Sequence, residues 1–266
     1  MEVRWHESER GGTHLWCADY GGSGSPVVLL HGLAGHAREW DSTAAWLTRS
    51  HRVVAPDLRG HGRSERAPAD VSPNAFAMDA EMWIERLGLS PAILVGQSLG
   101  GLIALRAAAR RPQALRALVV AEATPAEDPD GAAAVASWLE SWPVPFPSRA
   151  DALAFFGGDT LWAQAWSSGL EARAGGLWPA FDAGVLLDAL RQANARDCWA
   201  EWASIRCPAL VVRAASGSAR EEAEHMLELL PGTQLAEIAD SGHDVHLDQP
   251  ERWRTAVGDF LDELDR

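Results

Sequence analysis

The sequence predicts an α/β fold with a mostly parallel sheet, helices on both faces and an all-helical insertion. Three observations support this. Short aliphatic runs, each bounded by Gly or Pro, alternate with longer helical patterns. The strand pattern stops near residue 125 and resumes after residue 202. The 266 residues suffice for one large core with an insertion. We therefore expect a core of residues 1–124 and 203–266, and a helical lid, the cap, of residues 125–202.

The elements follow one another in a regular order. The segment from Val3 to Asp19 predicts two antiparallel edge strands around Gly11-Gly12. Near-continuous aliphatic runs predict strands buried on both faces at Val27–Leu30, Val53–Ala55, Ala92–Val95, Leu118–Ala121 and Ala209–Val212. Gln234–Ile238 is also strand-like. Helical patterns cover Glu39–Arg49, Asn74–Leu87, Leu99–Arg110, Arg220–Leu230 and Pro250–Leu264. Such alternation is typical of a parallel sheet covered by helices.

The cap differs from the core in composition. It holds 7 of the 13 tryptophans and shows no convincing strand pattern. A small lid needs fewer aromatic residues for its own packing, so we expect some of them to face the site. Trp138, Trp142 and Trp178 are the candidates for substrate contact, although each could equally belong to the interior of the cap.

Charge and composition exclude several classes of function. There are 23 Lys+Arg against 37 Asp+Glu, a net charge of −14, which argues against nucleic acid or an anionic membrane as partner. Every basic residue except His is Arg, because the chain contains no lysine. This excludes a Schiff-base lysine, a pyridoxal-phosphate site and a phosphate loop ending in Gly-Lys-Ser/Thr.

The cysteines and the apolar segments predict the cellular compartment of the protein. Cys17, Cys198 and Cys207 are too few and too scattered for a disulfide framework or a zinc site. The polar N-terminus lacks the apolar core of a signal peptide, and no apolar run approaches the ~20 residues of a membrane helix. We expect a cytoplasmic protein with reduced thiols, no cofactor and no metal. The sequence does not determine the oligomeric state.

A nucleophile motif follows the strand at Ala92–Val95. Gly96-Gln97-Ser98-Leu99-Gly100 lies between this strand and a helical pattern, so it is Gly-x-Ser-x-Gly in a strand–turn–helix context. The turn is so tight that side chains at the flanking positions would collide with neighbouring backbone. It presents the serine at a helix N-terminus, whose dipole favours a developing anion. We therefore predict that Ser98 is a nucleophile rather than part of a plain Gly-rich turn.

Two further loops complete the predicted chemistry. His31-Gly-Leu-Ala-Gly35 follows an earlier strand, so the Leu33 amide is a candidate oxyanion donor together with the Leu99 amide. Gly32 and Gln97, beside these donors, are candidates for substrate contact. His243, after the last strand, is the candidate base.

The last loop also contains His246, which we expect to be structural. A metal site formed by His243 and His246 with Asp244 and Asp248 is the weaker alternative, since no further ligands cluster nearby.

These motifs together resemble those of serine hydrolases with the α/β-hydrolase fold. The resemblance rests on HGLAG at 31–35, DLRGHGRS at 57–64, GQSLGG at 96–101 and SGHDVHLDQPE at 241–251. It implies a structural turn at 57–64 and a cap that covers the active site. Because the nucleophile is Ser rather than Asp, the resemblance disfavours haloalkane dehalogenases and epoxide hydrolases.

The chain departs from this family at the acid of the triad. The family usually places the acid after strand seven, but residues 210–219 contain no carboxylate, only hydroxyls at Ser216 and Ser218. Glu122 directly follows the Leu118–Ala121 run. A Glu at this position resembles that of the fungal lactonases that open zearalenone. We predict Glu122 as the acid; Glu221, Glu222 or a dyad without an acid are the alternatives.

The predicted function is hydrolysis of an ester or lactone through an acyl-enzyme formed by Ser98, His243 and Glu122. The aromatic cap favours an apolar, cyclic or aromatic small-molecule substrate. The alternatives are a biosynthetic acyltransferase, thioesterase or cyclase, and a non-catalytic ligand receptor.

Overall fold

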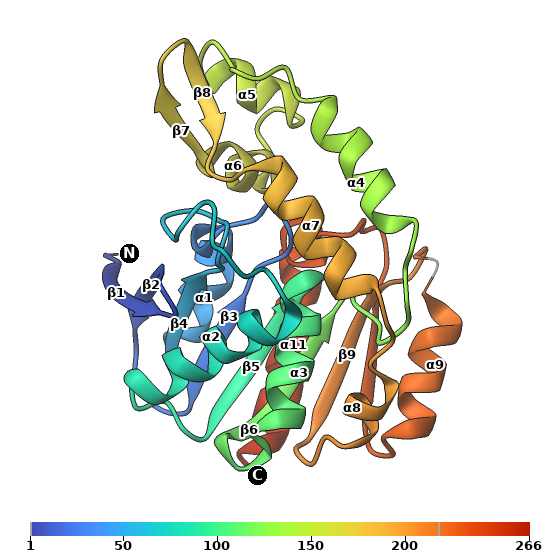
Figure 1. Ribbon diagram of the computed structural model, residues 1–266. Coiled ribbons are helices and arrows are strands. Elements are labelled where there is room, and N and C mark those ends of the chain that lie inside the picture. Colours follow the sequence, from blue (N-terminus) through green and yellow to red (C-terminus); the bar gives the residue numbers. More distant parts are fainter. Residues whose placement is uncertain (1, 218) are drawn as a thin grey trace.

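Eight strands form one sheet in the order β1-β2-β4-β3-β5-β6-β9-β10 (Figure 1). The structure, a computed structural model, describes residues 2–217 and 219–266. Strands β4 to β10 of this order run parallel, and β1 and β2 add an antiparallel edge. The strands are β1 (Arg4–Arg10), β2 (Thr13–Gly21), β3 (Pro26–Leu30), β4 (Arg52–Asp57), β5 (Ala92–Gln97), β6 (Leu115–Ala121), β9 (Ala209–Ala214) and β10 (Gln234–Ile238).

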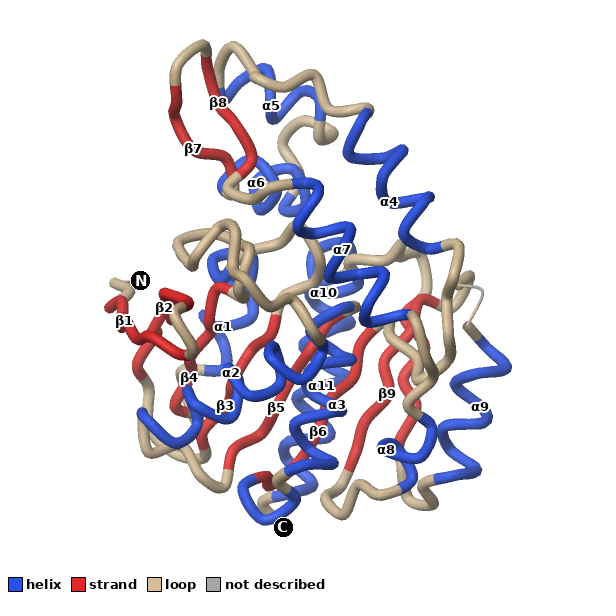
Figure 2. The backbone as a smooth tube through the Cα atoms, viewed as in Figure 1, coloured by secondary structure: helices blue, strands red, loops and turns tan. Residues whose placement is uncertain are grey.

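Helices cover both faces of the sheet, as predicted (Figure 2). One apolar cluster contains side chains of α2 (Pro73–Arg86), α3 (Leu99–Arg110), α8 (Trp199–Ala203) and α9 (Arg220–Leu229). The other contains side chains of α1 (Asp41–Leu47) and α11 (Pro250–Leu264). The predicted helix at Glu39–Arg49 is instead a 3-10 turn, η1 (Ala37–Trp40), followed by α1.

Strand β3 shows why continuous aliphatic runs are needed. Val27 and Leu29 belong to the cluster with α11, whereas Val28 and Leu30 belong to the cluster with α3. Successive side chains of a strand point to opposite faces, so a strand covered on both faces needs apolar residues at every position.

The segment between β6 and β9 contains the cap, which was predicted to be all-helical but is not. It contains α4 (Gly131–Glu140), α5 (Arg149–Phe155), α6 (Leu161–Ser168) and α7 (Ala183–Asn194), and α8 follows. It also contains an antiparallel hairpin of β7 (Leu170–Arg173) and β8 (Gly176–Pro179). Each strand has four residues, too few for periodicity to distinguish from a loop.

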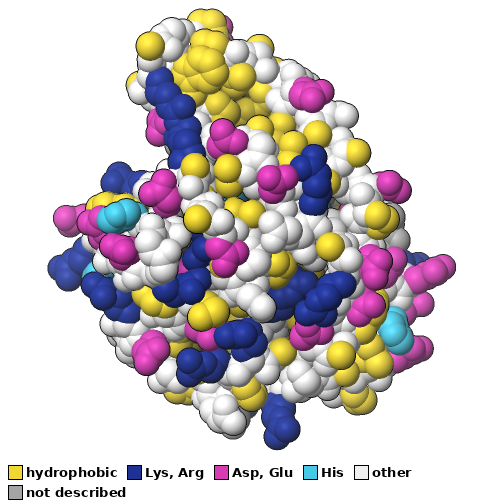
Figure 3. All heavy atoms as spheres, viewed as in Figure 1, with side chains coloured by type: hydrophobic (Ala, Val, Ile, Leu, Met, Phe, Trp, Pro, Cys, Tyr) yellow, Lys and Arg dark blue, Asp and Glu magenta, His cyan; other side chains and the backbone are white. Residues whose placement is uncertain are grey.

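The cap lies above the carboxyl edge of the parallel strands (Figures 1 and 2). Its own apolar cluster is built around Trp142, Phe146 and Phe156, with neighbouring ring centroids 4.9 to 6.4 Å apart. Figure 3 shows apolar side chains gathered on the cap at the top of the view. Much of the aromatic content therefore holds the cap together. None of the described helices combines the length and apolarity needed to cross a membrane.

Candidate active site

Ser98 occupies a strained turn between β5 and α3. Its backbone has φ 51° and ψ −120°, a conformation that non-glycine residues rarely adopt. A Cβ at Gly96 would lie 2.1 Å from the Gly100 carbonyl oxygen, and one at Gly100 would lie 2.2 Å from the Leu30 carbonyl oxygen. Both flanking glycines are therefore required by the close approach of backbone, as the motif predicts.

Glu122 lies at the end of β6 and faces His243. Its Oε2 is 3.3 Å from His243 Nδ1, and its Oε1 accepts a hydrogen bond of 2.5 Å from the Ala214 amide. Glu122 also has a positive φ of 49°. Among the described residues, no other carboxylate forms an ion pair with His243; Glu221 and Glu222 lie on α9.

The surroundings of His243 raise its pKa. The side chain is 59% exposed, because it faces an open cavity. Burial by the surrounding loops lowers the pKa, but the hydrogen bond to Glu122 and the charges of Asp244, Glu122 and Asp248 outweigh this effect. The net result is a pKa above the ordinary value, so His243 becomes a neutral base only at correspondingly higher pH.

Ser98 and His243 line two lobes of one cavity. The first lobe, of about 390 Å³, extends past Glu122 between α4 and α9 and includes Asp128. The second, which we call the aromatic lobe, has a volume of about 480 Å³ and lies under α4 and α6. Its wall contains Leu33, Gln97, Val135, Trp138, Trp162 and Trp166. A substrate bonded at Ser98 can thus extend in two directions.

The predicted substrate contacts need correction within the cap. Trp138 lines the aromatic lobe, but Trp142 and Trp178 line neither lobe. Trp142 is 5% exposed and packs in the interior of the cap, and Trp178 donates its indole N–H to the Ala174 carbonyl of the β7–β8 turn. Trp162 and Trp166, which were not among the predicted contacts, line the aromatic lobe instead.

The oxyanion candidates lie beside the nucleophile. Leu99 is the first residue of α3, so its amide has no acceptor within the helix. Leu33 lines the aromatic lobe together with Ser98. Gly32 lines neither lobe; a Cβ there would lie 2.2 Å from Gln97 Oε1. Gly32 therefore allows the loop of residues 31–35 to approach the turn that contains Gln97 and Ser98.

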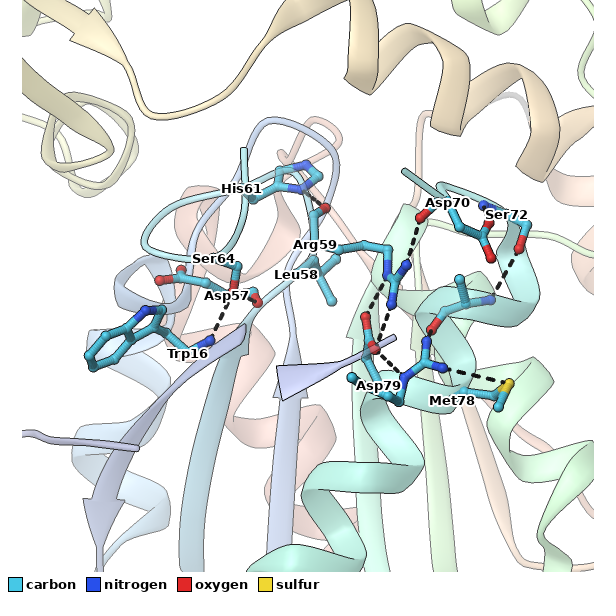
Figure 4. A network of polar contacts seen from close by, with 12 residues as sticks. Trp16, Asp57, Leu58, Arg59, His61, Ser64, Asp70, Ser72, Met78 and Asp79 are labelled. Carbon is cyan, nitrogen blue, oxygen red and sulfur yellow. Dashed lines mark hydrogen bonds and ion pairs between the residues drawn. The ribbon is translucent and has the colours of Figure 1, made fainter. Parts of the chain in front are cut away.

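A network of polar contacts fixes the turn after β4 (Figure 4). Two further hydrogen bonds connect this turn to Ala34 and Ala37. Asp57 accepts hydrogen bonds from the Ala37 and Arg63 amides, and Arg59 forms a buried ion pair with Asp79. His61 Nε2 lies 3.2 Å from the amide nitrogen of Ala34, which follows Leu33 in the loop of residues 31–35.

Burial keeps the His61 ring neutral, so that its Nε2 can accept the hydrogen bond from the Ala34 amide. It lowers the pKa of His61 to about 4. The neutral ring can therefore accept the hydrogen bond from Ala34, and its other nitrogen donates to the Arg59 carbonyl at 2.9 Å. The turn at residues 57–64 thus also holds the loop of residues 31–35 through His61.

From the sequence, Asp244 was considered only as a possible metal ligand; the structure places it on the wall of the aromatic lobe. Its Oδ2 accepts hydrogen bonds from the indole N–H groups of Trp162, at 2.7 Å, and Trp166, at 3.1 Å. Gln97 Nε2 donates to the His243 carbonyl at 2.9 Å and lies 3.4 Å from Asp244 Oδ1. The cap, the turn that contains Gln97 and Ser98, and the loop that contains His243 therefore meet at Asp244. The position of Asp244 directly after His243 was the one feature of the sequence that could have placed it near the site.

His246 lies away from the cavity. Its ring is 1% exposed, stacks on Trp40 with centroids 4.2 Å apart, and has Nε2 3.4 Å from Glu39 Oε1. This placement suits a structural residue. The described residues contain no group of three or more His, Cys, Asp or Glu that could hold a metal ion.

Comparison with known proteins identifies the family. Residues 27–256 match the model of the alpha/beta hydrolase family. The N-formylmaleamate deformylase of Pseudomonas putida is 31% identical over 249 residues, 91% of each chain. The polyketide synthase ThaQ of Burkholderia thailandensis is 32% identical over 269 residues, 91% of this chain but 12% of that protein. The solved structure of E-2-(acetamidomethylene)succinate hydrolase has a TM-score of 0.89 at 23% identity, covering 98% of this chain and 100% of that one. The chain belongs to the alpha/beta hydrolase family.

Proposed function

We propose that the protein is a serine hydrolase that cleaves an ester or lactone bond of an apolar, ring-containing substrate. One observation carries the proposal: Ser98 stands at the strained turn, and the His243 ring that lines the same cavity contacts the Glu122 carboxylate at 3.3 Å. The chain order Ser98, Glu122, His243 is that of a nucleophile, acid and base in this fold.

The mechanism follows from these positions. Glu122 accepts a hydrogen bond from the Nδ1–H of His243, so the unprotonated Nε2 takes the proton of the Ser98 hydroxyl as Oγ attacks the carbonyl carbon. The amides of Leu33 and Leu99 stabilise the oxyanion. His243 then gives its proton to the leaving oxygen, which leaves an acyl-serine. Water, deprotonated by His243, attacks the ester, and Ser98 regains its proton.

The lining of the cavity supports the substrate class. Val135, Leu33 and the three tryptophans of the aromatic lobe offer apolar surface beside the nucleophile. Apolar pockets with few polar groups favour ligands that are mainly apolar. In a lactone the acyl and alcohol halves are joined, so ring opening would leave both halves attached to Ser98 until water releases the hydroxy acid.

Serine labelling and turnover test the proposal together. Wild-type protein should hydrolyse p-nitrophenyl esters and form a covalent adduct with a fluorophosphonate at Ser98, located by peptide mass spectrometry. Ser98→Ala should fold normally, take no label and lose roughly 10⁴-fold or more in turnover. Retained turnover in purified Ser98→Ala would refute the assignment. A ligand receptor would show neither label nor turnover.

Acyl transfer is the second candidate, and the similarity to a segment of a polyketide synthase favours it. An acyltransferase would pass the acyl group from Ser98 to an alcohol or amine instead of water. Adding such an acceptor during ester turnover and separating the products distinguishes the two. Acid as the main product supports the hydrolase, whereas an ester or amide of the acceptor supports the transferase.

A further inference from the structure

The aromatic lobe is lined by negative but not by permanently positive side chains. Among the described residues on its wall, the charged carboxylates are Asp244 and Asp248, and neither Lys nor Arg is present. His243, the base, contacts Glu122. The rest of the wall is apolar, aromatic or uncharged.

Two hydrogen bonds hold the Asp244 carboxylate at this wall. The indole N–H groups of Trp162 and Trp166 both donate to Oδ2, at 2.7 and 3.1 Å. The two indoles come from the cap and Asp244 from the core, so the contact keeps a negative charge where the cap closes over Ser98.

We infer that Asp244 determines charge selectivity: the aromatic lobe is a subsite for an uncharged ring-bearing part of the substrate and rejects a part that carries a carboxylate. This inference rests on the proposed function, because the lobe is defined by its opening at Ser98. A substrate carboxylate there would lie near Asp244 and Asp248 in a partly desolvated space, with no arginine to pair with it. An uncharged ring avoids this repulsion and retains contact with Trp138 and Trp166.

The test uses two matched pairs of esters. In the first, the acyl half changes: p-nitrophenyl phenylacetate against its 4-carboxy derivative. In the second, the alcohol half changes: phenyl acetate against 4-carboxyphenyl acetate. For each pair, kcat/KM for the neutral ester is divided by kcat/KM for the anionic ester. The two pairs cover both orientations of a substrate at Ser98, and intrinsic reactivity cancels when the ratio is compared between variants.

Asp244→Asn is the informative substitution. Its amide oxygen can accept from both indoles, and its NH₂ group then faces Gln97 Nε2 at the long contact of 3.4 Å, so the charge is removed with little loss of hydrogen bonding. Asp240→Asn is the matched control. It removes the same charge on the same loop, but Asp240 is 79% exposed, pairs with Arg252 and lines neither lobe.

We expect Asp244→Asn to lower the ratio of kcat/KM for the neutral ester to kcat/KM for the anionic ester by roughly tenfold or more in at least one pair. Asp240→Asn should leave both ratios within about twofold of wild type. Unchanged ratios in Asp244→Asn, or an equal fall in Asp240→Asn, would overturn the inference but not the serine mechanism, which depends on Ser98→Ala. If Asp244→Asn is too slow to assay, the same comparison is made with the Kd values of phenylacetamide and phenylacetate from tryptophan fluorescence. An unchanged Kd ratio would also overturn it.

Discussion

Replacing Glu122 with Gln removes the negative charge beside His243 and keeps the shape of the side chain. The structure fixes how the new amide must lie. The Ala214 N–H donates to Oε1 at 2.5 Å and can only donate, so the amide oxygen of Gln must take this position. The NH₂ group then takes the position of Oε2, 3.3 Å from His243 Nδ1.

This arrangement reverses the tautomer of His243. An NH₂ group donates to Nδ1, so the ring proton moves to Nε2, where it faces the Ser98 hydroxyl and cannot accept its proton. In a serine protease, the same change from acid to amide lowers turnover by about 10⁴-fold. We expect a loss of that order in kcat for Glu122→Gln, about 5 kcal/mol of transition-state stabilisation.

The assay is kcat on a p-nitrophenyl ester at a pH where wild-type activity is maximal. Circular dichroism and thermal unfolding establish that the variant is folded. Glu221→Gln, on α9, is the matched control and should stay near wild type. If Glu122→Gln retains more than about a tenth of wild-type kcat, Glu122 is not the acid and the tautomer argument is wrong.

Three further outcomes are expected. Activity should be lost as pH falls through the raised pKa of His243, so the acid limb of the kcat/KM profile should lie above pH 6.5, the ordinary pKa of His. In Glu122→Gln this limb should shift to lower pH. An unmoved limb would contradict the conclusion that Glu122 raises the pKa of His243. Trp138→Ala should lower kcat/KM for p-nitrophenyl phenylacetate more than for the smaller p-nitrophenyl acetate, whereas Trp178→Ala, outside both lobes, should affect the two substrates equally. The unfolded chain binds a proton at His61 near pH 6.5, whereas the folded chain binds it only near pH 4. His61 should therefore lower the free energy of unfolding by about 3 kcal/mol as pH decreases from 7 to 4. Urea titrations at these two pH values should show a smaller decrease in His61→Gln.

Local sequence determined the frame of the site. The aliphatic runs predicted β3, β5, β6 and β9, because a strand buried on both faces has no polar position. The Gly-x-Ser-x-Gly turn was equally recognisable, since Gly96 and Gly100 are forced by backbone contacts within a few residues of Ser98 or on the adjacent strand. The contact of Glu122 with His243 was predictable from the place of Glu122 after β6 and from the absence of a carboxylate in residues 210–219. Of the two hydroxyl residues noted there, Ser218 lies outside the described residues.

Only the tertiary structure showed which cap residues reach the cavity. Aromatic residues occur throughout the cap, so composition alone could not separate Trp142, in its interior, from Trp166, on the wall of the lobe. The orientation of each helix over the core makes that difference. The contact of Asp244 with Trp162 joins residues 82 positions apart, and that of Glu122 with His243 joins residues 121 apart. Such contacts depend on how the cap and the loops pack, whereas periodicity and turn motifs report only on neighbouring positions in the chain.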